Sequence, residues 1–140
     1  MKDDVNPNFR FYVEIDEKKQ AVFTEVSGLQ IETVVQEYEE GGNNGYVHRL
    51  PGRTKVSNLT LKRGITRSNE FFKWQAEIAS GKITRRNISL VIYDVKGDVL
   101  IRWEFIKAYP VKWIGPQLSA DGHAMAIETL ELAHDGVKLG

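Results

Sequence analysis

Residues 87–105 read NISLVIYDVKGDVLIRWEF, and this stretch decides the fold class. Apolar residues stand at every second position from Ile88 to Ile92 and again from Val99 to Phe105. A period of two is typical of β-strands that bury one face. Lys96-Gly97 lies between the two runs, and glycine has the backbone freedom that a tight hairpin turn needs. The stretch therefore predicts an antiparallel β-hairpin.

Short extended segments also fill most of the rest of the chain. A polar turn at 17–20 and breaks such as Ser27-Gly28 and Gly115-Pro116 separate them. Besides the hairpin, we expect strands at about 9–15, 21–26, 29–38, 54–63, 111–114 and 124–133. No alternation of strands with helices appears. The pattern predicts a mainly β fold, an antiparallel β-barrel or sandwich of about seven strands.

One flanking α-helix is predicted from about Ser68 to Ser80. Ser68 is a suitable N-cap, and Gly81 is a natural stop. Phe71, Trp74 and Ile78 recur at helical spacing, so they share one face that we expect to pack on the sheet.

A long loop is predicted from about Glu39 to Arg53. This segment contains Gly41-Gly42-Asn43-Asn44-Gly45 and then Leu50-Pro51-Gly52, which are residue types that favour turns. Long loops in a compact domain are uncommon and usually functional, so contacts with other molecules are expected here first.

Composition bounds the class of protein. The 140 residues suit a single domain spanning 1–140, and 41% apolar with 27% charged residues is typical of a globular chain. The 19 basic and 19 acidic residues balance, so there is no overall field to hold nucleic acid or an anionic membrane. Without cysteine, the chain has neither disulfides nor a thiolate zinc site. The polar N-terminus does not resemble a signal peptide and no apolar run is long enough to span a bilayer, so we expect a cytoplasmic product.

The histidines and Ser27 do not have the spacing of a metal-binding or catalytic motif. His48, His123 and His134 are far apart, without a metal-ligand motif, and Ser27 lacks the glycine and helix of a nucleophile elbow. We therefore expect no catalytic residues, no metal and no cofactor. The basic pairs Lys62-Arg63 and Arg85-Arg86 are interpreted as ordinary surface charge.

The chain resembles the inner tube proteins of contractile tails. The matching stretches follow one another in order: 23–29 (FTEVSGL), 50–52 (LPG), 59–64 (LTLKRG), 109–113 (YPVKW) with Gly115-Pro116, and 127–136 (IETLELAHDG). Relatives include phage tail tubes, extracellular contractile injection particles and, more distantly, the ring protein of type VI secretion.

The resemblance implies a structural protein rather than an enzyme. It implies hexameric rings stacked into a hollow tube inside a contractile sheath, with baseplate, spike and tube-terminator proteins as further partners. Such a tube is a conduit, and its cargo is either protein effectors, in a headless injection particle, or DNA, in a phage. A monomeric ligand-binding β-barrel and a hydrolase remain as alternatives.

The resemblance also implies that the long loop contacts the next ring. The ring-stacking hypothesis therefore names charged and turn residues at and beside this loop: Glu37, Glu39, Glu40, Gly41, Gly42, Asn43, Asn44, Gly45, Arg49 and Arg53. Its charges are expected to pair across rings and to fix the rotation of one ring on the next.

Overall fold

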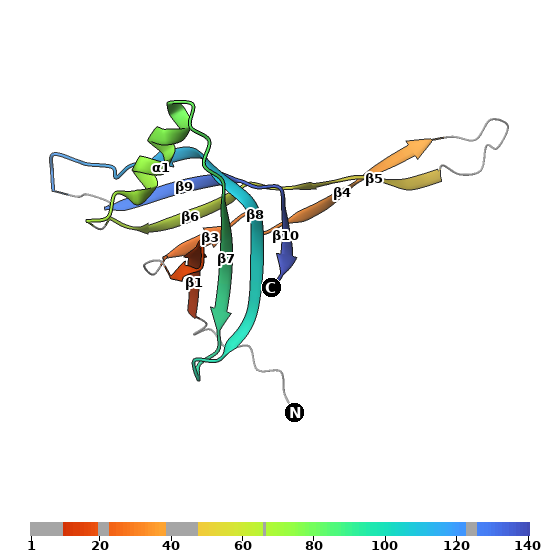
Figure 1. Cartoon of the computed structure of the whole chain (residues 1–140), viewed down its shortest axis with the longest axis horizontal. Coiled ribbons are helices and arrows are strands. Elements are labelled where there is room, and N and C mark those ends of the chain that lie inside the picture. Colours follow the sequence, from red (N-terminus) through yellow and green to blue (C-terminus); the bar gives the residue numbers. More distant parts are fainter. Residues whose placement is uncertain (1–9, 20–22, 39–47, 66, 123–125) are drawn as a thin grey trace.

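The computed structural model describes residues 10–19, 23–38, 48–65, 67–122 and 126–140. Within these residues the chain forms ten strands and one helix (Figure 1). They are β1 (Arg10–Ile15), β2 (Lys18–Lys19), β3 (Glu25–Ser27), β4 (Ile31–Tyr38), β5 (His48–Val56), β6 (Leu59–Gly64), α1 (Glu70–Ala79), β7 (Arg86–Tyr93), β8 (Val99–Ile114), β9 (Ile127–Ala133) and β10 (Gly136–Leu139).

The main sheet is antiparallel and folds into two layers. Its strand order is β2-β1-β7-β8-β9-β6-β3, with β10 also paired to β8. Strand β8 is 16 residues long and belongs to both layers: its first half pairs with β7 and β10, and its second half pairs with β9. Lys107 lies between the two halves with φ at 52°. Because the path ends at β2 and β3 without closing, the architecture is sandwich-like rather than a closed barrel.

The core lies between these layers. Strands β6 and β9 alternate strictly between buried and half-buried residues, so one face of each strand enters the core. The opposite layer contributes Val13, Ile15, Ile88, Leu90 and Phe105, which face Leu59, Leu61, Leu130 and Leu132. The predicted hairpin is confirmed as β7 and β8, with Gly97 at φ 90° in its turn.

Helix α1 packs against β8 and closes one side of the core (Figure 1). Phe71 and Trp74 are buried, as the helical spacing predicts, and the Trp74 Nε1–H donates to the Thr84 carbonyl at 2.9 Å. The helix ends in a Schellman motif, because the Lys82 N–H donates to the Glu77 carbonyl around Gly81. Asn69 rather than Ser68 occupies the N-cap position, and the helix begins at Glu70.

Several predicted boundaries are wrong. Residues 48–53 are not loop, because they pair with β4 and form the first part of β5; cross-strand pairing here overrides the turn propensity of Pro51 and Gly52. The predicted strand 54–63 is the end of β5 and all but the last residue of β6, separated at Ser57 and Asn58. The predicted strand 111–114 is the end of β8, and the predicted turn 17–20 lies at 16–17.

Candidate assembly surfaces

Strands β4 and β5 form a two-stranded ribbon that projects from the sandwich (Figure 1). Every residue of the ribbon is exposed or half-buried. An isolated pair of strands is only marginally stable in water, since it buries little apolar surface. Contact with another chain would therefore stabilise the ribbon.

Both faces of the ribbon carry apolar side chains. The register places Ile31 and Val35 on one face and Tyr38 and Leu50 on the other, and these four side chains are between 45% and 59% exposed. Two cross-strand ion pairs accompany them, Arg49–Glu37 at 3.3 Å and Lys55–Glu32 at 3.5 Å. Such exposed pairs contribute only about 0–1 kcal/mol each. A ribbon with no purely polar face fits an element that other chains contact on both sides.

The four strands β1, β7, β8 and β10 form a sheet with two open edges. On one side, β1 pairs with β2 only at Glu14 and Ile15, so the edge beyond them has no strand partner among the described residues. On the other side, β10 pairs only with β8. An open edge presents backbone N–H and C=O groups that another strand can pair with.

The register shows which backbone groups point outward at each edge. The Gly140 N–H donates to the Arg102 carbonyl, and the Asp16 N–H donates to the Asn87 carbonyl. In an antiparallel pair, alternate residues bond the partner strand. Val137 and Leu139 on β10, and Phe11 and Val13 on β1, therefore direct their backbone groups away from the sheet.

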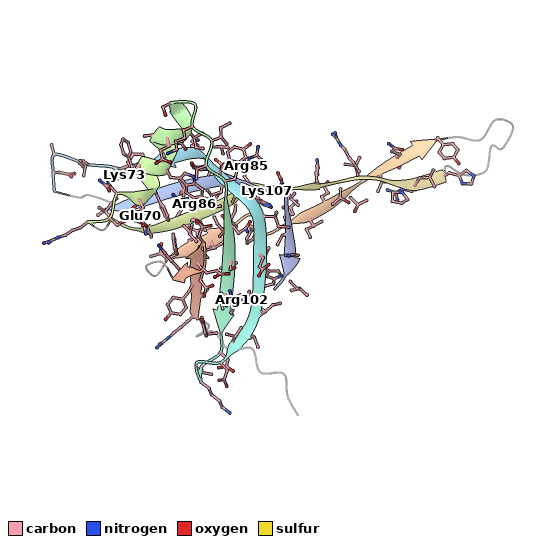
Figure 2. All side chains as sticks on the ribbon, in the orientation of Figure 1. Glu70, Lys73, Arg85, Arg86, Arg102 and Lys107 are labelled. Carbon is pink, nitrogen blue, oxygen red and sulfur yellow. The ribbon has the colours of Figure 1, made fainter. Side chains whose placement is uncertain are left out.

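One face of this four-stranded sheet is polar. A row of directly opposed residues runs across it: Glu14, Ser89, Glu104 and Lys138. Arg102 lies in the next row on the same face (labelled in Figure 2) and donates from Nη1 to Glu14 Oε2 at 2.8 Å. Lys138 Nζ lies 3.6 Å from Glu104 Oε2. An arginine side chain is always charged in a protein, and the hydrogen bond to Glu14 raises the pKa of Arg102 further.

An apolar groove lies at the base of the ribbon, beside β10. Leu29 and Ile31 form one wall, and Trp103, Val137 and Leu139 form the other. Leu139 is 69% exposed and Ile31 is 59% exposed, which is unusual for side chains of this size. The groove therefore links the base of the ribbon to the open β10 edge.

The sequence of residues 7–138 matches the family model described as "T4-like virus tail tube protein gp19". The chain belongs to this tail tube family. No curated protein sequence matches the chain significantly.

Solved structures agree with membership in the tail tube family. A chain from the PVC sheath/tube terminator of an extracellular contractile injection system, in the extended state, is 26% identical over 99% of this chain and 98% of that chain, with a TM-score of 0.86. A chain from the cap that terminates the anti-feeding prophage tube is 26% identical over 99% and 95%, with a TM-score of 0.84. Hcp1 from Flavobacterium johnsoniae, at 16% identity over 94% of both chains and a TM-score of 0.57, shares the fold.

Three of the predicted ring-stacking residues of this tail tube protein lie on the ribbon. Glu37 and Arg49 are directly opposed on β4 and β5 and pair with each other, and Arg53 follows on β5. The other predicted residues lie outside the described part of the chain: Glu39, Glu40, Gly41, Gly42, Asn43, Asn44 and Gly45.

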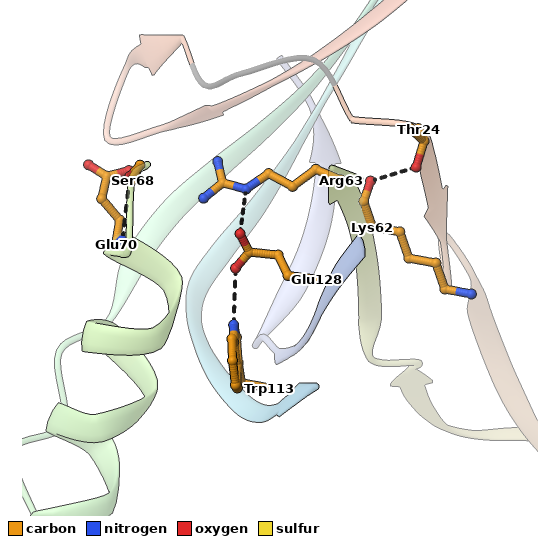
Figure 3. A network of polar contacts seen from close by, with 7 residues as sticks. All are labelled: Thr24, Lys62, Arg63, Ser68, Glu70, Trp113 and Glu128. Carbon is orange, nitrogen blue, oxygen red and sulfur yellow. Dashed lines mark hydrogen bonds and ion pairs between the residues drawn. The ribbon is translucent and has the colours of Figure 1, made fainter. Parts of the chain in front are cut away.

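A buried polar network was missed by the sequence interpretation, which placed Arg63 on the surface. Arg63 is 2% exposed and donates from Nε to Glu128 Oε2 at 3.2 Å, while the Trp113 Nε1–H donates to Glu128 Oε1 at 3.0 Å (Figure 3). The Arg63 guanidinium carbon also lies 3.9 Å from the centre of the Phe71 ring. The network joins β6, β9, the second half of β8 and α1, which all border the same side of the core.

The network had a signal in the sequence. Arg63 continues the buried alternation of Leu59 and Leu61, and Glu128 begins that of Leu130 and Leu132. Opposite charges at the ends of two apolar faces predict a buried ion pair once the two strands are known to be neighbours.

The residues first weighed for chemistry do not come together in the structure. Ser27 lies on β3, and His134 lies between Ser57 and Gly136, with its ring nitrogens 2.9 and 3.2 Å from their carbonyl oxygens. His123 lies outside the described residues. No cluster of histidine, aspartate and glutamate suited to a metal ion occurs in the described part of the chain. Nor does that part contain a helix of the length and apolarity needed to cross a membrane.

Proposed function

We propose that this protein assembles into hexameric rings, and that the rings stack into the hollow inner tube of a contractile injection machine, inside its sheath. The tube carries cargo and performs no bond chemistry. The observation that supports this most is the four-stranded sheet with an open edge on each side, in a chain that belongs to the tail tube family.

Ring formation would satisfy both open edges at once. The strands β1, β7, β8 and β10 alternate in direction, so β1 of the next subunit can follow β10 as an antiparallel neighbour. An even number of strands in each subunit preserves this alternation around a closed ring. Closure removes edges that would otherwise pair indiscriminately.

The shape of the subunit supports one orientation within the proposed ring. The layer of β3, β6 and β9, together with α1, covers only the core-facing side of the four-stranded sheet (Figure 1). The outer circumference of a ring exceeds its inner circumference, so each subunit has more room on the outside. The bulkier side of the subunit, which carries the second layer and α1, therefore faces outward. The polar face with Glu14, Arg102, Glu104 and Lys138 then lines the lumen.

Further partners follow from this role. The subunit would be made and assembled in the bacterial cytoplasm, and the tube would meet a sheath protein around it, baseplate and spike proteins at one end and a terminator at the other. Related chains come from a PVC sheath-tube complex and an anti-feeding prophage baseplate, which supports these assignments.

The β10 edge gives the first test of the ring. Leu139 directs its N–H outward and its side chain is mostly exposed, so Leu139→Pro removes an edge donor while leaving the bonds to β8 in place. Each lost hydrogen bond is worth about 1 kcal/mol, and six junctions are affected, so we expect the concentration needed for assembly to rise by roughly tenfold or more. Analytical ultracentrifugation measures this shift.

The matched control for the β10 edge is Leu139→Ala, which keeps the N–H and removes most of the side chain. Circular dichroism should show that both variants remain folded. Assembly of Leu139→Pro at the same concentration as Leu139→Ala would show that β10 is not a ring junction.

The ribbon is proposed as the ring-stacking element, with contributions from the loop residues beyond Tyr38. Val35 and Leu50 lie on opposite faces of the ribbon and neither is buried, so Val35→Ser with Leu50→Ser should leave folding and rings intact. We expect tubes at least about threefold shorter in electron micrographs, because apolar contact area is lost at every ring-to-ring contact. Ile83→Ser is the control, since Ile83 is 62% exposed but lies away from the ribbon. Equal tube lengths in the two variants would place stacking elsewhere.

A further inference from the structure

The polar face of the four-stranded sheet carries charged side chains that pair with one another in its two central rows. Its two central rows contain two carboxylates, Glu14 and Glu104, and two cations, Arg102 and Lys138. Each cation lies against one of the carboxylates, at 2.8 Å and 3.6 Å. The charges in these rows are thus balanced in pairs: Arg102 on β8 reaches across β7 to Glu14 on β1, and Lys138 on β10 pairs with Glu104 on the adjacent β8.

The closer pair is also partly shielded from solvent. The side chains of Arg102 and Glu14 are only 31% and 18% exposed, so their position is set by the neighbouring residues of the sheet. Val91, directly opposite Arg102, is fully buried on this same face, which makes the surroundings of the pair apolar. Such surroundings screen an ion pair less than bulk water does.

We propose that Glu14 and Glu104 are the residues that stop the lining of the tube from retaining polyanions such as nucleic acid, because they neutralise Arg102 and Lys138 in place. This inference rests on the proposed function, which turns the polar face towards the lumen. A polyanion binds mainly by displacing counterions from unpaired cations. Cations that already have carboxylate partners offer little of that gain, so a charged cargo passes along the wall without being held.

The inference has a mutational consequence. Glu14→Gln with Glu104→Gln preserves the size and the hydrogen-bond acceptor of each side chain but leaves Arg102 and Lys138 without charged partners. In an assembled tube, this change repeats in every subunit of every ring. The lining then becomes a cationic surface wrapped around the lumen.

The probe is a short fluorescent single-stranded DNA mixed with assembled tubes and sedimented with them. Wild-type tubes should retain little DNA. Tubes of the double variant should retain at least roughly tenfold more at 50 mM salt, and their affinity should fall by roughly tenfold or more towards 200 mM, as expected for contacts with phosphates.

The matched control is Glu70→Gln with Glu77→Gln, which makes the same change in net charge on helix α1. Control tubes should behave like wild type, because α1 lies on the far side of the subunit. Double-variant tubes that retain no more DNA than control tubes would overturn the inference, as would wild-type tubes that already retain as much as the variant.

A second measurement separates this inference from the proposed function. Fluorescence anisotropy of the same DNA with unassembled subunits reports on the sheet face whether or not tubes form. Tighter binding by the double variant than by the control supports self-neutralisation, and equal binding overturns it. Failure of the wild-type protein to form tubes contradicts the proposed function alone.

Discussion

Replacing Glu128 with leucine should lower the free energy of unfolding by about 3–5 kcal/mol, because it leaves the buried Arg63 guanidinium without its counter-charge. The same change removes the acceptor of the Trp113 Nε1–H. Single domains are stable by only about 5–15 kcal/mol, so the loss should be plain in a urea titration followed by circular dichroism.

The control for Glu128→Leu is the double variant Arg63→Met with Glu128→Leu. It removes both charges, so it should recover most of the lost stability, as expected when a buried ion pair is replaced by apolar side chains of similar size. Trp113 is only half-buried, so the loss of the acceptor of its indole N–H should leave a remaining cost of about 1 kcal/mol. If Glu128→Leu unfolds at the same urea concentration as wild type, the ion pair between Arg63 on β6 and Glu128 on β9 does not stabilise the fold.

The second large effect is expected at Trp74. Trp74→Ala removes a side chain that is 2% exposed and packs in the core, and it deletes the hydrogen bond to the Thr84 carbonyl. Large aromatic truncations in a core cost about 3–5 kcal/mol, since the cavity collapses only in part. We expect a subunit with a strongly lowered melting temperature in circular dichroism.

Lys73→Ala is the matched control for Trp74→Ala, because Lys73 is exposed on the same helix. It should change stability by no more than about 0.5 kcal/mol. A melting temperature of Trp74→Ala equal to that of Lys73→Ala would mean that the apolar face of α1 does not anchor the helix to the sheet.

The elements predicted well from the sequence are those in which local pattern and tertiary structure agree. The hairpin of β7 and β8 follows from its period of two and its glycine turn, and α1 follows from the spacing of Phe71 and Trp74. In each case the residues that define the pattern are also the residues that the core buries. The resemblance of short sequence stretches to contractile-tail tube proteins also predicted the family correctly.

The errors arise where long-range pairing decides the structure. Residues 48–53 contain proline and glycine, yet they pair with β4 because a neighbouring strand satisfies their backbone groups. A single strand 54–63 is predicted from the apolar residues Val56, Leu59 and Leu61, but the chain changes from ribbon to sandwich at Ser57-Asn58, because Val56 pairs with β4 and Leu59 pairs with β9.

The candidate assembly surfaces depend on which strands pair with one another, and the periodicity of the sequence does not predict that. The open edge of β10 exists because β9 and β10 both pair along the same side of β8. To predict the rows of the polar face, one would need the registers of three strand pairs: β1 with β7, β7 with β8, and β8 with β10. Three of the residues named in the ring-stacking hypothesis, Glu37, Arg49 and Arg53, lie on the ribbon, and ring stacking itself stays a prediction.

The most direct test of the proposed tube is negative-stain electron microscopy of the purified wild-type protein at high concentration, without any cofactor. The account predicts six-fold rings with an open centre, singly or in short stacks, with the ribbons of one ring reaching the next. Particles that remain monomers of 15.9 kDa at every concentration would contradict it.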